Sequence, residues 1–172
     1  MNNIILTGFM GTGKTTVGRR LAAMLGLDFK DTDEYVKKCE KMTVYDVIKK
    51  KGRKYFEGAE RFAVINLAEC ENTVISTGGT CLWNEENRQT LKKSGKLIWL
   101  KASADTVYQN TKNSRNKRSE LCGLSFCEVE DLVKLSEKHY ENCDFSVCVD
   151  DKEVDEIAKE IISFLQGQRE NI

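Results

Sequence analysis

The chain of 172 residues contains no proline, a single histidine and no excess of either charge, with 27 Lys and Arg against 27 Asp and Glu. An average composition would include about eight prolines at this length, but their absence indicates no particular function. Zero net charge without a long basic run argues against a nucleic-acid partner. Hydrophobic residues make up 40% and charged residues 31%, which is typical of a globular protein. We therefore expect a single domain over residues 1–172.

Long apolar runs and paired metal ligands are also lacking. No segment approaches the roughly 20 apolar residues of a membrane-spanning helix, and the N-terminus lacks the basic and apolar regions of a signal peptide. The seven cysteines are an odd number, and none of them pair at the two-residue spacing of a zinc half-site. His139 has no partner arrangement for a metal. These absences favour a cytoplasmic protein with reduced thiols, no membrane partner and no cysteine metal site.

Short apolar runs alternate with longer segments of helical spacing. The predicted strands are Asn3–Thr7, Asp28–Lys30, Thr73–Thr77, Lys96–Lys101 and Phe145–Val149. The predicted helices include Thr15–Leu25, Glu34–Glu40, Glu57–Glu69, Asn84–Lys93, Ala104–Asn110, Glu128–Glu141 and Glu153–Leu165. This alternation predicts a parallel sheet covered on both faces, which binds its ligand at the carboxyl ends of the strands. The polar stretch 110–123 is typical of a mobile loop over that edge.

The strongest motif is GFMGTGKT at residues 8–15, which fits the phosphate-binding pattern G-x-x-x-x-G-K-[ST]. Its glycines allow backbone amides to turn towards a phosphate. Lys14 is expected to reach the β- and γ-phosphates, and the Thr15 hydroxyl is expected to ligate Mg²⁺. The motif follows an apolar strand and opens an amphipathic helix, which is the context that this chemistry requires. The predicted binding set for ATP, with Mg²⁺ as cofactor, is Gly8, Gly11, Thr12, Gly13, Lys14, Thr15 and Thr16.

Two weaker motifs follow the second and third predicted strands. Asp31 and Asp33 should point the same way, towards the ligand edge, because alternate residues share a face as the chain leaves a strand. One carboxylate could support Mg²⁺ and the other could orient or deprotonate an acceptor hydroxyl. Capping of a helix is the alternative role for such aspartates. Gly78 and Gly79 could let a ligand approach the backbone, or could form a plain turn.

Together, these motifs resemble the shikimate kinase family, at close to its spacing and over essentially the whole chain. The resemblance implies an α/β three-layer sandwich of the P-loop, nucleoside-monophosphate-kinase-like class. Its five-stranded parallel sheet would have the order 2-3-1-4-5, with a mobile lid over about residues 110–123. It also implies transfer of the ATP γ-phosphate to a hydroxyl, which in that family is the 3-hydroxyl of shikimate. We expect a monomer that binds ATP and a small hydroxyl-bearing metabolite.

The nucleotide half of the family pattern is largely present when it is matched residue by residue. Lys14 and Thr15 match its P-loop, and Asp31 matches its Mg²⁺-associated aspartate. Asp33 matches the aspartate that holds the acceptor hydroxyls, and Arg118 matches the lid arginine that reaches the phosphates and the substrate. The resemblance thus implies Lys14, Asp33 and Arg118 as catalytic residues, with Thr15 and Asp31 at the metal.

The acceptor half departs from that pattern. Glu57 stands where the family has a carboxylate-binding arginine, Ser136 replaces a second arginine, and Thr80 replaces a third glycine. The lid arginine that stacks on adenine falls near Thr111, with Lys112 as the candidate substitute. The implied acceptor-binding set is Asp33, Glu57, Gly78, Gly79, Thr80 and Ser136.

These departures bear on the acceptor. Loss of two arginines would weaken binding of an acid by about 3–6 kcal/mol, at about 1.5–3 kcal/mol for each charge-assisted hydrogen bond. We therefore expect a non-carboxylate polyol rather than shikimate, with Glu57 repelling an anion. Compensation is the alternative, because Glu57 could pair with Arg61 while Lys54 supplies the missing charge.

Two other functions stay open. The first is a catalytically silent ATP-binding protein, which the presence of the chemistry-bearing residues disfavours. The second is a nucleoside-monophosphate kinase, which the short region between the second and third predicted strands disfavours, because it leaves little to hold a second phosphate.

Overall fold

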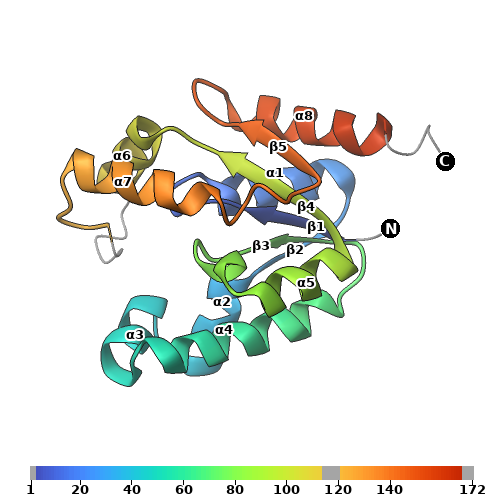
Figure 1. The fold of residues 1–172 in the computed structure, drawn as a ribbon. Coiled ribbons are helices and arrows are strands. Elements are labelled where there is room, and N and C mark those ends of the chain that lie inside the picture. The colour runs from blue at the N-terminus through green and yellow to red at the C-terminus, as the bar shows by residue number, and fades with distance from the viewer. Residues whose placement is uncertain (1–2, 114–120, 168–172) are drawn as a thin grey trace.

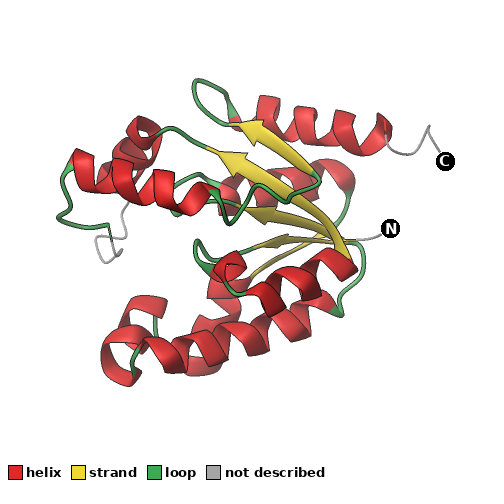
Figure 2. Ribbon diagram, in the orientation of Figure 1, coloured by secondary structure: helices red, strands yellow, loops and turns green. Residues whose placement is uncertain are grey.

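A sheet of five parallel strands lies between layers of helices in the computed structural model, which describes residues 3–113 and 121–167 (Figures 1 and 2). The strands are β1 (Asn3–Thr7), β2 (Asp28–Asp31), β3 (Thr73–Ser76), β4 (Gly95–Lys101) and β5 (Phe145–Cys148). Their order across the sheet is β2-β3-β1-β4-β5, and all neighbours in it run parallel. The expected α/β sandwich and its strand order are confirmed.

The helices mostly follow the predicted segments but begin and end at different residues. They are α1 (Lys14–Leu25), α2 (Thr32–Glu40), α3 (Val44–Lys51), α4 (Arg53–Ala68), α5 (Glu85–Ser94), α6 (Ala104–Asn113), α7 (Phe126–Glu137) and α8 (Val154–Gly167), with a 3₁₀ turn η1 (Cys81–Trp83). Helix α3 was not expected, and α4 begins at Arg53 rather than at Glu57. The first residues of the expected lid belong to α6, while residues 114–120 lie outside the described residues.

The central strand β1 is buried on both faces, so its alternate side chains enter different cores. Ile4 and Leu6 belong to a core that includes residues of α1 and α8. Ile5 points the other way, into a core with residues of α4 and α5. A smaller cluster of Val36, Val47 and Phe56 joins α2, α3 and α4 beside the sheet. These helices therefore form a separate wall, which Figure 1 shows below the sheet and which adjoins its ligand edge.

The register of the strands brings three loops to one edge of the sheet. Leu6 of β1 and Asp31 of β2 both align with Ser76 of β3. The segments that follow these residues therefore leave the sheet at the same level, as they must where parallel strands end together. The loop after β3 is fastened to β1, because the Thr77 amide donates a hydrogen bond to the Leu6 carbonyl at 3.0 Å. Tertiary pairing thus assembles the three sequence motifs at one place.

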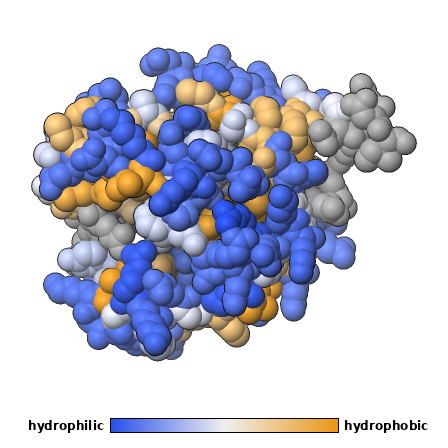
Figure 3. Space-filling view, viewed as in Figure 1, coloured by the Kyte–Doolittle hydropathy of each residue, from blue (hydrophilic) through white to orange (hydrophobic). Residues whose placement is uncertain are grey.

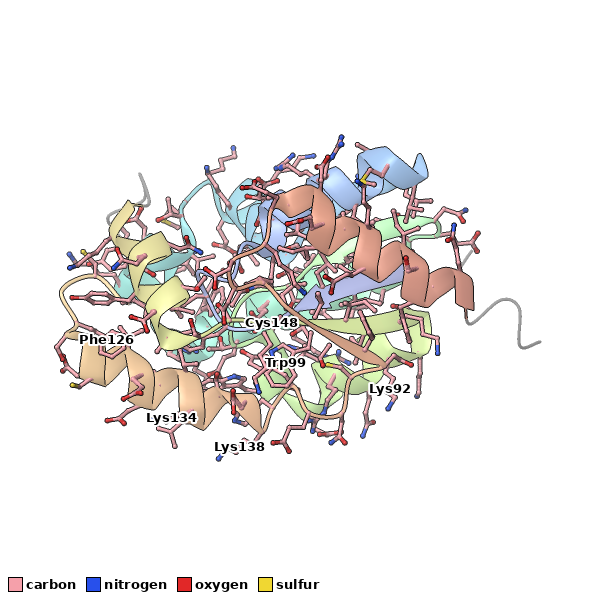
Figure 4. All side chains as sticks on the ribbon, turned by 90° about the horizontal axis from the view of Figure 1, so that it is seen from above. Lys92, Trp99, Phe126, Lys134, Lys138 and Cys148 are labelled. Carbon is pink, nitrogen blue, oxygen red and sulfur yellow. The ribbon has the colours of Figure 1, made fainter. Side chains whose placement is uncertain are left out.

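One face of the molecule is largely polar. Hydrophilic side chains cover most of the face in Figure 3, with smaller hydrophobic patches between them. Lys134 and Lys138 project outwards from the α7 side of the molecule (Figure 4). Among the helices that the structure describes, none is long and apolar enough to cross a bilayer.

Candidate active site

The loop between β1 and α1 borders a cavity of about 980 Å³ at the carboxyl edge of the sheet, which we call the nucleotide cavity. Gly8, Gly11 and Gly13 adopt φ angles of 139°, 80° and 86°, a region that side chains with a Cβ rarely enter. A Cβ on Gly8 would also lie 2.5 Å from the carbonyl oxygen of Leu100. The loop turns directly into the N-terminus of α1, whose unpaired amides favour an anion. The cavity therefore has the geometry of a phosphate site.

The ammonium group of Lys14, the first residue of α1, lies against this loop. Its Nζ donates hydrogen bonds to the carbonyl oxygens of Gly8 and Phe9, both at 2.8 Å. Burial lowers the pKa of Lys14 from 10.5 to about 8, and the nearby carboxylates of Asp33 and Asp31 oppose that shift. A bound phosphate would replace the two carbonyls as partner and stabilise the ammonium charge.

Asp31 serves α2 and faces the P-loop at the same time. Its Oδ1 accepts hydrogen bonds from the amides of Asp33 and Glu34, at 2.9 and 3.2 Å, and so caps α2. Its Oδ2 accepts a hydrogen bond from Thr15 Oγ1 at 2.9 Å. The capping role and the position beside the predicted metal ligand therefore coexist in one side chain.

The donor set around Thr15 fits Mg²⁺. Thr15, Asp31 and Asp33 all border the nucleotide cavity and offer only oxygen atoms, which this ion prefers. Over residues 3–113 and 121–167, no group of three or more His, Cys, Asp or Glu side chains could hold a metal unaided. Both observations suit an ion that arrives with a nucleotide, since Mg²⁺ commonly combines one or two carboxylates with phosphate oxygens.

A second cavity, of about 380 Å³, opens beside the first between α2, α3, α4 and the loop after β3. We call it the acceptor cavity. Met10, Asp33 and Gly79 border both cavities. Asp33 therefore stands at the junction, where a carboxylate could contact a group in the acceptor cavity close to the nucleotide phosphates.

The glycine loop after β3 approaches other parts of the protein closely. A Cβ on Gly78 would lie 2.7 Å from Asp33 Oδ1 and 2.9 Å from Glu60 Oε1. A Cβ on Gly79 would lie 3.0 Å from the backbone nitrogen of Met10. These positions are more than a plain turn, because the missing side chains leave room for two carboxylates and for the P-loop.

The loop is also fastened from both sides by hydrogen bonds. The Gly78 amide donates to Thr32 Oγ1 at 2.8 Å, and the hydroxyl of the buried Tyr140 donates to the Gly79 carbonyl. Tyr140 is itself packed against Trp99 of β4, with ring centroids 5.8 Å apart (Trp99 is labelled in Figure 4). The position of the glycine loop is thus tied to the core of the protein.

Glu60 of α4 was not predicted from the sequence. It borders the acceptor cavity and is only 4% exposed. Its spacing of four residues from Phe56 was the available signal, because that spacing places an acid on the buried face of the helix. Burial of an acid is uncommon unless it is paired or functional.

Other predicted acceptor residues lie apart from the cavity. Glu57 borders neither cavity and its side chain is 56% exposed, with Oε1 3.6 Å from Arg53 Nε. Ser136 is buried, and its Oγ donates to the carbonyl oxygen of Val133 at 2.7 Å. Thr80 does border the acceptor cavity, together with Arg53. The structure therefore brings Asp33, Gly78, Gly79 and Thr80 together without Glu57 and Ser136.

The proposed substitutes for the family's missing cations lie elsewhere. Arg61 has its Nε 3.5 Å from Glu86 Oε2, whereas Glu57, the partner that compensation required, pairs with Arg53. Lys54 borders a different groove, which residues of α2 and α4 line. Thr111 borders the nucleotide cavity, whereas the Lys112 Nζ lies 4.3 Å from the ring centroid of Tyr108. Arg118 lies outside the described residues.

Similar proteins cover almost the whole chain. The family model described as shikimate kinase matches residues 10–166. The shikimate kinase of Caldanaerobacter subterraneus is 40% identical over 164 residues, which is 94% of this chain and 95% of that protein. The shikimate kinase of Pelotomaculum thermopropionicum is 39% identical over 166 residues, with 96% of each chain covered.

Solved structures agree with this similarity. The structure of shikimate kinase from Acinetobacter baumannii in complex with shikimate matches with a TM-score of 0.91 at 27% identity, over 98% of this chain and 94% of that one. The shikimate kinase structure from Aquifex aeolicus has a TM-score of 0.85 at 34% identity, over 97% of this chain and 98% of that one.

Proposed function

Since this chain belongs to the shikimate kinase family of ATP-dependent kinases, we propose that it transfers the γ-phosphate of ATP to a hydroxyl of a small molecule bound in the acceptor cavity. The observation that carries the proposal is the shared wall of the two cavities. Asp33 borders both of them, so a hydroxyl held by this carboxylate would be presented to the phosphate end of the nucleotide. The acceptor cavity, at about 380 Å³, suits a metabolite rather than a polymer.

The proposed mechanism relies on position and charge, as phosphoryl transfer generally does. The P-loop amides and Lys14 would bind the β- and γ-phosphates and offset the charge that develops during transfer. Thr15 and Asp31 would hold Mg²⁺, which neutralises phosphate charge when it is bound. Asp33 would align the acceptor hydroxyl and accept its proton. We also propose that Arg118 contacts the phosphates and that about residues 110–123 form a lid, because the family resemblance implies both.

Two classes of acceptor remain candidates. Shikimate is the compound bound in the Acinetobacter baumannii relative. A non-carboxylate polyol is the acceptor favoured by the residues at positions 57 and 136, which are not arginines here. Because Glu57 and Ser136 do not border the acceptor cavity, the charge preference depends on the side chains that do. We further propose that the enzyme acts as a monomer in the cytoplasm.

A phosphoacceptor screen with MgATP tests the proposed function. Shikimate, other hydroxy acids and neutral polyols would be supplied one at a time, with ADP formation as the readout. We expect acceptor-dependent ADP formation that falls by about 10²–10³-fold in Lys14→Met, the range seen when one group that stabilises the transition state is removed. ADP formation that is the same in Lys14→Met and in the unchanged protein would refute the active-site assignment. Nucleotide binding without acceptor-dependent turnover would favour the silent alternative.

A further inference from the structure

Helix α4 presents one face to the acceptor cavity, and that face does not include Glu57. Arg53, Phe56 and Glu60 border the cavity, at positions i, i+3 and i+7 of the helix, which lie on one side. Glu57 lies one helical turn after Arg53 and pairs with it at 3.6 Å, but it borders neither cavity. The cation that α4 brings to the cavity is Arg53, one helical turn before the position at which the family carries its arginine, and Lys37 of α2 also borders the cavity.

We infer that Arg53 determines the charge preference of the acceptor cavity, and that its guanidinium binds a carboxylate carried by the acceptor. This inference rests on the proposed function, because it concerns the compound that accepts the phosphate. It places the acceptor hydroxyl at Asp33 and the acceptor carboxylate at Arg53, one helical turn away from the position of the family's arginine.

Contacts with Thr80, Glu57 and Phe56 help to hold the guanidinium at the cavity. Arg53 Nη2 donates a hydrogen bond to Thr80 Oγ1 at 3.0 Å. The Nε lies 3.6 Å from Glu57 Oε1, and the Cζ lies 5.8 Å from the ring centroid of Phe56. Because an arginine fork carries five N–H donors, it can bind a carboxylate while it keeps its bond to a hydroxyl.

Two departures from the family pattern acquire a joint role in this arrangement. Thr80 supplies the hydroxyl that orients Arg53, and a glycine at that position could not supply one. Glu57, which does not border the cavity, forms an ion pair with Arg53 at 3.6 Å and so contributes to the position of the guanidinium.

The charges of the cavity are arranged to suit a hydroxy acid. Two carboxylates, Asp33 and Glu60, converge on Gly78, and Asp33 is shared with the nucleotide cavity. Arg53 contacts Thr80, which lies two residues further along the glycine loop. A molecule with its hydroxyls near these carboxylates and its own carboxylate near Arg53 would donate hydrogen bonds to the former and place its charge beside an opposite one.

The test uses matched pairs of an acid and its neutral counterpart: shikimate and methyl shikimate, quinate and methyl quinate, and gluconate and glucitol. Steady-state kinetics with MgATP, and calorimetric binding in the presence of MgADP, would be measured for each compound. We expect the unchanged protein to favour the acid in the pair that it uses. Arg53→Gln should raise KM for that acid by about ten- to thirty-fold, the lower part of the range for a hydrogen bond to a charged group, because the side chain is 41% exposed. The neutral counterpart should change by less than about two-fold.

Lys54→Gln is the matched control, since it removes the same charge from the next residue of α4, which borders a different groove. It should leave both members of each pair unchanged. A preference of the unchanged protein for the neutral compound in every pair would overturn the inference, as would equal losses for acid and neutral compound in Arg53→Gln. Failure of the proposed function looks different: no compound would yield ADP, while the calorimetric comparison of acid with neutral compound would still report on Arg53.

Discussion

Nucleotide binding should weaken steeply with pH just above neutrality, because of Lys14. Burial lowers the pKa of this side chain from 10.5 to about 8, a shift that corresponds to about 3 kcal/mol against the charged form. Phosphate groups beside the ammonium favour its charged form, so binding raises the pKa again. The protein therefore takes up a proton on binding at pH values above about 8, and affinity must fall as the pH rises through that range.

The size of the effect follows from the fraction of protein that is ready to bind. With a pKa of about 8 in the free protein, Lys14 is charged in about nine-tenths of the molecules at pH 7 and in about one-tenth at pH 9. Apparent affinity is reduced by the competent fraction, so the Kd for MgADP should rise about ten-fold between these values.

Calorimetric titration with MgADP from pH 7 to 9.5 would measure this effect. Lys14→Met is the control, because its side chain is neutral throughout; it should bind weakly at pH 7 and show no comparable slope. At each pH, the Kd of the unchanged protein is divided by the Kd of Lys14→Met. Titration of the nucleotide and of other groups affects both values equally and therefore drops out of this ratio. A Kd for the unchanged protein that stays constant from pH 7 to 9, or an equal slope in Lys14→Met, would refute the reasoning.

The same pKa also affects folding. Because the pKa is lower in the folded protein than the ordinary value of 10.5, the penalty for the buried charge is fully present below about pH 8. It is removed as the pH rises from about 8 towards 10.5, where the unfolded chain still binds the proton and the folded protein does not. Lys14 by itself therefore contributes a rise in stability with pH over that interval.

Three further predictions concern the walls of the site. Asp31→Asn keeps an oxygen that caps α2, so the free energy of unfolding measured in urea should fall by less than about 0.5 kcal/mol. The Mg²⁺ concentration needed for half-maximal activity should rise several-fold, and an unchanged concentration would mean that Asp31 acts only as a helix cap. Gly78→Ala should lower kcat by about ten- to hundred-fold, because the new Cβ displaces the neighbouring carboxylates. The control is Gly58→Ala, whose Cβ would meet nothing within 4 Å and which should stabilise α4 by about 0.5–1 kcal/mol without loss of activity. Equal kcat values in the two variants would contradict this prediction. Tyr140→Phe leaves a carbonyl of the glycine loop without its donor and should reduce the free energy of unfolding by about 0.5–1.5 kcal/mol, and urea midpoints that do not differ would exclude that contribution.

The fold and the nucleotide half of the site could be predicted because their signals are local. Alternation of apolar strands with helical segments suffices to indicate a doubly covered parallel sheet. The P-loop carries its chemistry in eight consecutive residues, whose glycines and lysine act through the backbone conformation of that loop itself. Helix α3 was missed because its eight residues include a run of three lysines, and so short a segment shows little periodicity.

The acceptor side was decided by tertiary structure. Which residue of α4 faces the cavity depends on where the helix begins and on how Phe56 and Ala63 pack against α2 and α3. In that packing Arg53 borders the cavity and Glu57 does not, although sequence position alone favoured Glu57. By itself, the sequence determined the fold class and the phosphate site, because both depend on neighbours along the chain. Which charged side chain of α4 borders the acceptor cavity depends on the placement of that helix against α2 and α3, which is set by contacts between residues that are distant in sequence.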